Sequence, residues 1–217
     1  MIYILLKGIL IGLLSSAPMG PVGMLCIQRT LNDGRPHGIV TGLGAAFGDV
    51  IYALITVIAA LGLGFIADYI EQHQIPFQIG GSIILVVFGY FVFKKNPSKN
   101  LTKLTKSELP FGKVFGSSLA LTLSNVGMLF LYIALFARFN IIDSSKMVYS
   151  LMVIPAIGAG ALLWWLFITY VVDKLRNKFN PRGLKAFNRV IGTILMLIGI
   201  VGILTGAYMQ FTGDVLV

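Results

Sequence analysis

The sequence contains one cysteine and few charged side chains, and each scarcity excludes a class of protein. The single cysteine, Cys26, cannot form an internal disulfide, and it argues against a two-thiol redox relay or a metal site built from thiolates. Charged residues make up 12% of the 217 residues, about half the fraction typical of soluble domains, whereas 57% are hydrophobic. The mean hydropathy is +0.89. Because so little charge cannot coat a water-soluble globule, we expect an integral membrane protein.

Acidic residues are also scarce, with eight Asp and Glu against 17 Lys and Arg, which gives a net charge of +9. In a soluble chain this balance would suggest nucleic-acid binding. Here the basic residues lie in short links between apolar runs, so the positive-inside bias explains them and we expect no nucleic-acid partner. The sequence shows neither a nucleotide-binding loop nor a catalytic triad. We therefore expect a protein that is not an enzyme and that needs no cofactor and no metal.

The chain is dominated by long apolar runs. A helix that crosses the hydrocarbon core of a bilayer needs about 20 mostly apolar residues. These runs do not alternate with period two, as the strands of a membrane barrel do. We predict an all-α integral membrane protein with six transmembrane helices in a single domain, residues 1–217, and with tilt or a break in the long second span. The predicted spans are 2–27, 38–66, 77–94, 111–137, 147–173 and 187–211.

The basic residues predict the orientation of these spans. The links after the first, third and fifth spans hold 14 of the 17 Lys and Arg residues. The opposite side carries three basic residues, together with Asp68, Glu71, Asp143 and Asp214. Since basic links stay in the cytoplasm, we expect a multi-pass protein with both termini outside. The lysine-rich link 94–113 is then a cytoplasmic segment that faces anionic lipid.

The two halves of the chain resemble each other. A shift of 104 residues makes two glycines and a run of four residues coincide. The matching pairs are Gly8 with Gly112, Gly12 with Gly116, and Val22 to Leu25 with Val126 to Leu129. Because each half holds three spans, the match predicts two inverted three-helix repeats, 1–95 and 110–217, an arrangement common in secondary transporters. The alternative is that glycines recur wherever membrane helices pack closely.

The first span contains a candidate binding site. Pro18 and Pro21 each lack an N–H group, so with Gly20 between them they must kink or open the helix. An opened turn supplies oriented backbone dipoles for an ion or a substrate, although a kink used only for packing is the alternative. The repeat places Asn125 opposite Pro21. Asn125, with Ser124 before it, is therefore a second candidate, with a purely interhelical contact as its alternative.

Asp49 is the only acidic residue in the interior of a predicted span. A carboxylate near the bilayer centre costs at least about 2.5 kcal/mol, so it should face the bundle interior and have a partner. Candidate partners are a proton, a cationic substrate or Asn125. The alternative is that Asp49 caps a half-helix at a break in its span. The small residues around Asp49 should let another helix, plausibly the first span, approach closely.

Counting residues from the cytoplasmic charges places Pro18, Asp49 and Asn125 at the same height, near the middle of the membrane. The same count places Trp164 and Trp165 at mid-bilayer rather than in an interfacial belt. We take Trp164 as a candidate cavity wall that could stack on a cation. It could equally be a core residue.

These features resemble the LysE/RhtB-type amino-acid exporters. The similar motifs are the proline-glycine-proline turn, the block Gly34-Arg35-Pro36-His37-Gly38, and the glycine-rich stretch that ends in Gly48-Asp49. Two features depart from the family pattern: Met19 is inserted into the turn, and Asn125 is followed by valine instead of proline. The resemblance implies efflux of amino acids or related small metabolites from the bacterial cytoplasm, in exchange for protons.

The sequence therefore predicts a secondary-active exporter in the bacterial cytoplasmic (inner) membrane. Its expected partners are a small-molecule substrate, protons and the lipid bilayer, and a homo-oligomer is possible. A metal-cation exporter and a non-transporting membrane scaffold are the alternatives, and a redox carrier is disfavoured by the lone cysteine. The predicted substrate and proton site consists of Asp49, Asn125, Ser124, Pro18, Gly20, Pro21 and Trp164.

Overall fold

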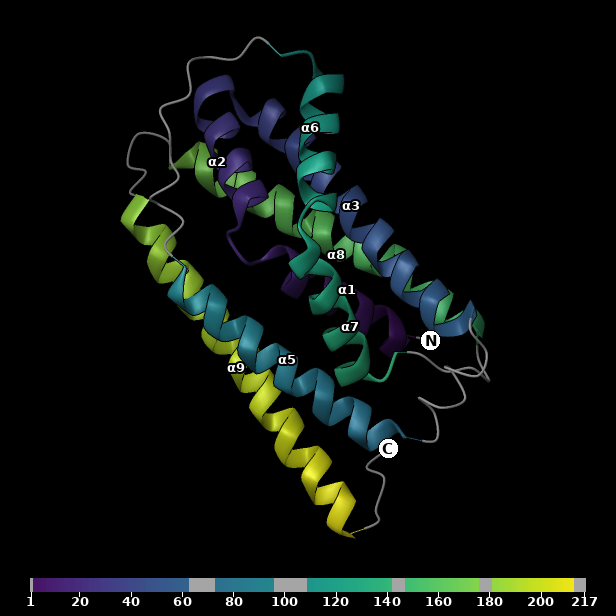
Figure 1. The fold of residues 1–217 in the computed structure, drawn as a ribbon. Helices are drawn as coiled ribbons and strands as arrows, with labels where there is room; N and C mark the ends of the chain where they lie inside the picture. Colours follow the sequence, from purple (N-terminus) through teal and green to yellow (C-terminus); the bar gives the residue numbers. More distant parts are fainter. Residues whose placement is uncertain (1, 63–72, 96–108, 142–146, 176–180, 213–217) are drawn as a thin grey trace.

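The computed structural model describes residues 2–62, 73–95, 109–141, 147–175 and 181–212, and these residues form helices and no strand (Figure 1). The expectation of an all-α protein is confirmed for them. The helices are α1 (Ile2–Ser16), α2 (Pro21–Asp33), α3 (Arg35–Gly62), α5 (Gln74–Lys94), α6 (Phe111–Leu123), α7 (Val126–Phe139), α8 (Met147–Lys174) and α9 (Pro181–Thr212).

Four of these helices, α3, α5, α8 and α9, are each long and apolar enough to cross a membrane without interruption. The other four form two bent pairs. The axis turns by 79° between α1 and α2 and by 68° between α6 and α7. The described residues thus provide four continuous spans, or up to six if each bent pair counts as one.

The two breaks have different chemical causes. Helix α1 ends at Ser16, and Pro21 occupies the first turn of α2, where the missing N–H group costs nothing. The second break, after Leu123, contains no proline. There the Tyr52 hydroxyl of α3 donates to the Leu123 carbonyl at 2.8 Å, which satisfies one of the acceptors that the end of α6 leaves free.

Helix α3 runs from Arg35 to Gly62 without interruption. The second predicted span therefore contains no break within the described residues. The alternative in which Asp49 caps a half-helix within this span is wrong, because Asp49 lies in the middle of continuous α3.

Small residues allow the helices to approach each other closely. Helix α1 crosses α8, and a methyl group at Gly8 would lie 2.6 Å from Cβ of Ala156. Helices α5 and α9 run side by side in opposite directions (Figure 1), and a methyl group at Gly192 would lie 2.6 Å from the Gly89 carbonyl oxygen. Substitution at these glycines would force the helix pairs apart.

Gly44 and Gly48, near Asp49, are approached by α6, and Gly42 by Trp165 of α8, rather than by the first span as expected. A methyl group at Gly44 would lie 2.6 Å from the Phe115 carbonyl oxygen, and one at Gly48 would lie 2.6 Å from Cγ2 of Thr122. At Gly112 and Gly116 of α6 itself, an added methyl group would meet no described residue within 4 Å apart from the nearby backbone of its own helix. The glycines matched by the repeat therefore do not make equivalent contacts.

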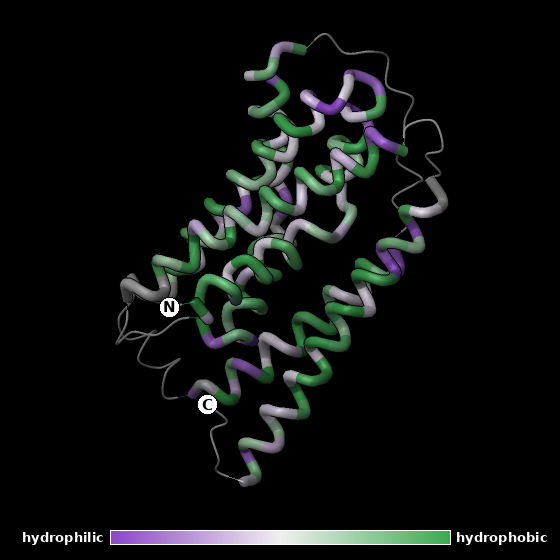
Figure 2. Tube along the Cα trace, turned by 180° about the vertical axis from the view of Figure 1, so that it is seen from behind, coloured by the Kyte–Doolittle hydropathy of each residue, from purple (hydrophilic) through white to green (hydrophobic). Residues whose placement is uncertain are grey.

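Hydrophobic residues predominate along the length of the helices (Figure 2), and many of them are exposed. Along α9 the exposed residues are spaced by three and four positions, which makes a stripe on the face opposite α5. The stripe consists of Val190, Ile194, Leu197, Val201 and Leu204, each between 39% and 64% exposed. So large an apolar surface is what a lipid environment requires.

The helix ends lie at two opposite ends of the molecule. The α2–α3 link, the ends of α5 and α8 and the starts of α6 and α9 gather at one end of the molecule, at the top and upper left of Figure 1. The start of α1 and the last described turn of α9 lie at the opposite end. Asp68, Glu71, Asp143, Asp214 and three of the six lysines of the 94–113 link lie outside the described residues.

Candidate functional site

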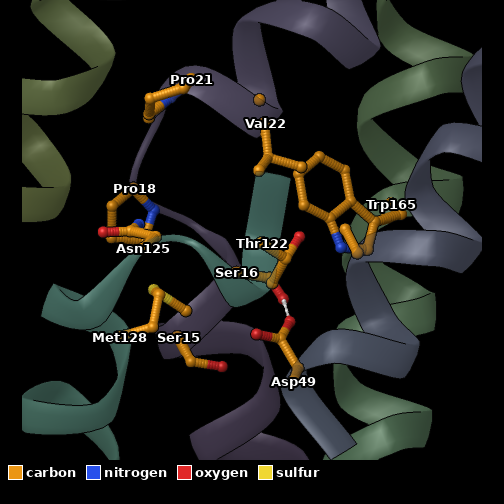
Figure 3. Close-up of a pocket in the computed structure, with 13 residues that line it drawn as sticks. Ser15, Ser16, Pro18, Pro21, Val22, Asp49, Thr122, Asn125, Met128 and Trp165 are labelled. Atoms are coloured by element: carbon orange, nitrogen blue, oxygen red, sulfur yellow. Dashed lines mark hydrogen bonds between the residues drawn. The ribbon is translucent and has the colours of Figure 1, made fainter. Parts of the chain in front are cut away.

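Both helix breaks face one buried cavity (Figure 3). Its volume is about 40 Å³, counted as the space open to the centres of water molecules. At roughly 10–15 Å³ per water in this measure, the cavity holds about three water molecules. Helices α3 and α8 and the two breaks supply its walls. The lining residues are Ser15, Ser16, Pro18, Gly20, Pro21, Val22, Gly23, Ala45, Asp49, Thr122, Asn125, Met128 and Trp165.

The structure brings five of the seven predicted site residues into this lining, namely Pro18, Gly20, Pro21, Asp49 and Asn125. The other two, Ser124 and Trp164, do not line it. The Ser124 side chain is exposed, and its hydroxyl donates to the carbonyl of Ala120 in its own helix. The Trp164 ring stacks on Phe187 of α9, with ring centroids 5.6 Å apart.

Among the described residues, Asp49 is the only ionisable side chain in the lining, and it is 2% exposed. The Ser16 hydroxyl, at the end of α1, donates to Oδ2 of Asp49 at 2.7 Å. The other oxygen, Oδ1, has no hydrogen-bond partner among the described residues. The site therefore presents one half-satisfied carboxyl group and no side-chain cation.

Hydroxyl groups connect the end of α1 to α7. The Ser15 hydroxyl and the Tyr132 hydroxyl are hydrogen-bonded at 2.9 Å, and Ser15 also approaches the Gly12 carbonyl of its own helix. Tyr132 is fully buried and lies within electrostatic range of Asp49. Its ring stacks on Tyr52, the residue that satisfies the second break. One polar network thus joins α1, α3 and α7.

Met19, the additional residue in the proline turn, is hydrogen-bonded to Asn188 in the second half of the chain. Met19 is 1% exposed, and its N–H group donates to Oδ1 of Asn188 at 2.9 Å. Nδ2 of Asn188 donates to the Met19 carbonyl oxygen at 3.4 Å. Asn188 is itself 1% exposed and belongs to α9. This helix therefore holds the opened turn in place.

Sequence reasoning missed Asn188 because the prediction placed it at the edge of the last span. It also missed the lining residues Ser15, Ser16, Thr122 and Trp165. The hydroxyls of Ser15 and Ser16, which Ala17 separates from Pro18, were a signal for the first break. Trp165 was predicted at the same depth as Trp164. Because their helix is apolar on all sides, its sequence pattern does not indicate which of the two faces the cavity.

Arg29 lies inside α2 and is 6% exposed, although the sequence placed it in the link after the first span. Its guanidinium donates to the Thr41 hydroxyl at 3.2 Å, to the Val114 carbonyl at 3.1 Å and to the Ser117 hydroxyl at 2.9 Å. These bonds join α2 to α3 and α6 near the basic end of the molecule. The sequence did not predict this burial, because the first span was expected to end at residue 27, whereas α2 continues to Asp33.

A bundle of apolar helices with two interrupted helices around a buried polar cavity is typical of secondary transporters. The sequence matches the LysE type translocator family over residues 13–206. Because this match covers most of the chain, the protein belongs to that family, and it is a multi-pass membrane transporter rather than an enzyme.

Two relatives agree with this assignment. The chain is 23% identical to "Putative amino acid efflux protein YcgF" of Bacillus subtilis (strain 168) over 198 residues, which cover 90% of this chain and 93% of the relative. It is 26% identical to "Uncharacterized membrane protein YahN" of Escherichia coli (strain K12) over 175 residues, 78% of this chain and 75% of the relative. No solved structure matches the chain significantly.

Proposed function

We propose that the protein is a secondary-active exporter of amino acids or related small metabolites, and that protons drive it. The observation that carries this proposal is the position of Asp49, a buried carboxyl group with one free oxygen beside a cavity between two helix breaks. Burying an ionisable group at this depth costs free energy, and such a group marks a substrate or proton path. The name of the Bacillus relative, which refers to amino acid efflux, agrees with this substrate class.

In the proposed cycle, Asp49 binds substrate and proton alternately. When the cavity opens to the cytoplasm, the ionised carboxylate binds the ammonium group of the substrate. When the cavity opens to the outside, a proton takes the place of the substrate on Asp49. The return step carries that proton inward, so each cycle exchanges substrate for a proton. The Pro18–Pro21 turn and Asn125 complete the binding site in this scheme.

We further propose six spans in two inverted repeats, with both termini outside the bacterial cytoplasmic membrane. The position of the breaks supports the repeat, since the 104-residue shift places Pro21, where α2 begins, on Asn125, directly before the first residue of α7. The large bends of both pairs, 79° and 68°, also support it. The charges near the helix ends support the orientation through the positive-inside bias.

The described residues contain no group of three or more His, Cys, Asp or Glu side chains that could hold a metal ion, so no observation here favours the metal-cation exporter. A non-transporting scaffold remains as an outcome of the test. The scaffold predicts that the cavity residues are dispensable for efflux, whereas an exporter requires them.

The test is a profile of intracellular metabolites in bacterial cells that express or lack the protein, challenged with amino acids and dipeptides. We expect expression to lower the level of at least one amino acid, and Asp49→Asn to abolish this effect while insertion into the membrane fraction is unchanged. Asp173→Asn, which changes an acid of α8 outside the cavity lining, serves as the matched control. Full efflux by Asp49→Asn would contradict the proposed role of Asp49, and no change in any metabolite would contradict export.

A further inference from the structure

Two buried polar atoms without a partner belong to residues that line the same cavity. Oδ1 of Asp49 is an acceptor, and Nε1 of Trp165 is a donor; neither has a hydrogen-bond partner among the described residues. Asp49 is 2% exposed and Trp165 is 5% exposed, so neither atom reaches bulk water. Buried polar groups in proteins are nearly always paired, and an unpaired one calls for an explanation. A ligand that accepts a hydrogen bond at one end and donates at the other would satisfy both.

Helix α3 leaves room for the Trp165 side chain at Gly42. A methyl group at Gly42 would lie 2.9 Å from Cγ of Trp165, so the absence of a side chain at Gly42 makes room for the indole. In Figure 3 the indole nitrogen lies on the edge of the ring toward Thr122 and Asp49, and Val22 lies beside the ring. The indole donor and the carboxyl group of Asp49 therefore belong to the lining of one cavity.

The first turn of α2 adds backbone donors next to this ring. Val22 and Gly23 line the cavity and follow Pro21, the first residue of the helix. The N–H groups in the first turn of a helix have no acceptor within the helix, and the helix dipole makes this end positive. This end of the cavity therefore favours an anionic group, as the N-termini of interrupted helices do in other transporters.

We propose that Trp165 recognises the carboxylate of the substrate through its indole N–H group, together with the first turn of α2, while Asp49 binds the ammonium group. This inference rests on the proposed export function and adds a requirement to it: the substrate must carry a free carboxylate as well as an ammonium group. Amines, and amino acids whose carboxylate is converted to an amide, are then poor substrates. Within the described part of the chain, no further charged side chain lines the cavity to receive a charged side chain of the substrate.

Trp164 provides a matched control for this assignment. Its indole nitrogen is also buried without a partner among the described residues, but its ring stacks on Phe187 and does not line the cavity. Substitution by phenylalanine removes the N–H group from either residue and keeps an aromatic ring. A difference between Trp165→Phe and Trp164→Phe therefore reports the position of the N–H group rather than the loss of an indole.

The experiment uses proteoliposomes that contain the full-length protein and are loaded with the twenty amino acids and their α-amides, with efflux of each compound measured by mass spectrometry. We expect the wild type to export at least one amino acid and to discriminate strongly against its amide. Trp165→Phe should lower this discrimination roughly ten- to a hundredfold, the range for losing one hydrogen bond to a charged group. Trp164→Phe should keep it.

Three results would overturn the inference. The first is a wild type that exports amide and acid equally well, which decides the matter even if Trp165→Phe fails to fold. The second is a Trp165→Phe variant that retains the discrimination. The third is a wild type that exports no amino acid at all, which would overturn the proposed function as well, whereas the first two leave that function intact.

Discussion

The contact between Met19 and Asn188 predicts how much stability the protein loses when Asn188 is replaced. The substitution Asn188→Leu keeps a side chain of similar size but removes the acceptor for the Met19 N–H group. Because Met19 is 1% exposed, its N–H group cannot turn to water instead. A buried donor left without a partner costs about 1–3 kcal/mol. The return contact at 3.4 Å is near the limit for a hydrogen bond, and its loss adds little.

Thermal unfolding in detergent measures this cost. For a protein of this size, about 1 kcal/mol shifts the melting temperature by about 2–4 °C, so Asn188→Leu should lower it by roughly 2–12 °C. Since Met19 belongs to the turn that lines the cavity, the apparent KM for export should rise as well. Thr193→Val is the control, because Thr193 is exposed on the same helix and its hydroxyl bonds only the Arg189 carbonyl.

A second arm tests whether Asn188 acts through the inserted residue. Deletion of Met19 gives the shorter proline-glycine-proline turn and removes the peptide group that Asn188 holds. We therefore expect Asn188→Leu to cost less in the chain that lacks Met19 than in the wild type. A melting temperature within about 1 °C of the wild type for Asn188→Leu, with unchanged export, would refute the reasoning.

Two further predictions concern packing around the cavity. Arg29→Met removes the three hydrogen bonds that join α2 to α3 and α6. The lone cysteine, Cys26, which is 1% exposed in α2, should then react with a maleimide several-fold faster than in the wild type. An unchanged labelling rate would show that these bonds do not hold α2 in place. Gly44→Leu should destabilise the protein by at least about 1–3 kcal/mol, because the side chain meets the backbone of α6, whereas Gly116→Leu on α6 points into open space and should be tolerated. Equal effects of the two leucines on the melting temperature would contradict the close approach of α3 and α6.

The parts of the fold that the sequence predicted follow from strong local chemistry. A membrane chain must satisfy its backbone within each helix, so long apolar runs predict helices. Pro18 and Pro21 predict the first break because proline cannot continue a helix undisturbed. Asp49 stood out because a carboxyl group is so costly at that depth, and the structure places it beside the predicted turn.

The parts that the sequence did not predict depend on contacts between distant segments. The partner of Met19 is 169 positions away, and nothing near Asn188 indicates which backbone group it holds. Trp164 and Trp165 are adjacent in an apolar helix, so the face that points into the cavity is set by α3, where Gly42 leaves room for Trp165. The close approach of α6 to Gly44 could not be predicted either, because any small-residue face accepts several neighbours.

The central claim, that Asp49 couples export to protons, is tested most directly in proteoliposomes loaded with amino acids and placed in a more acidic medium. The account predicts that the pH gradient drives efflux by the wild type, that a protonophore stops it, and that Asp49→Asn shows no gradient-driven efflux. Efflux that is as fast without the gradient, or that Asp49→Asn sustains at the wild-type rate under the gradient, would contradict the account.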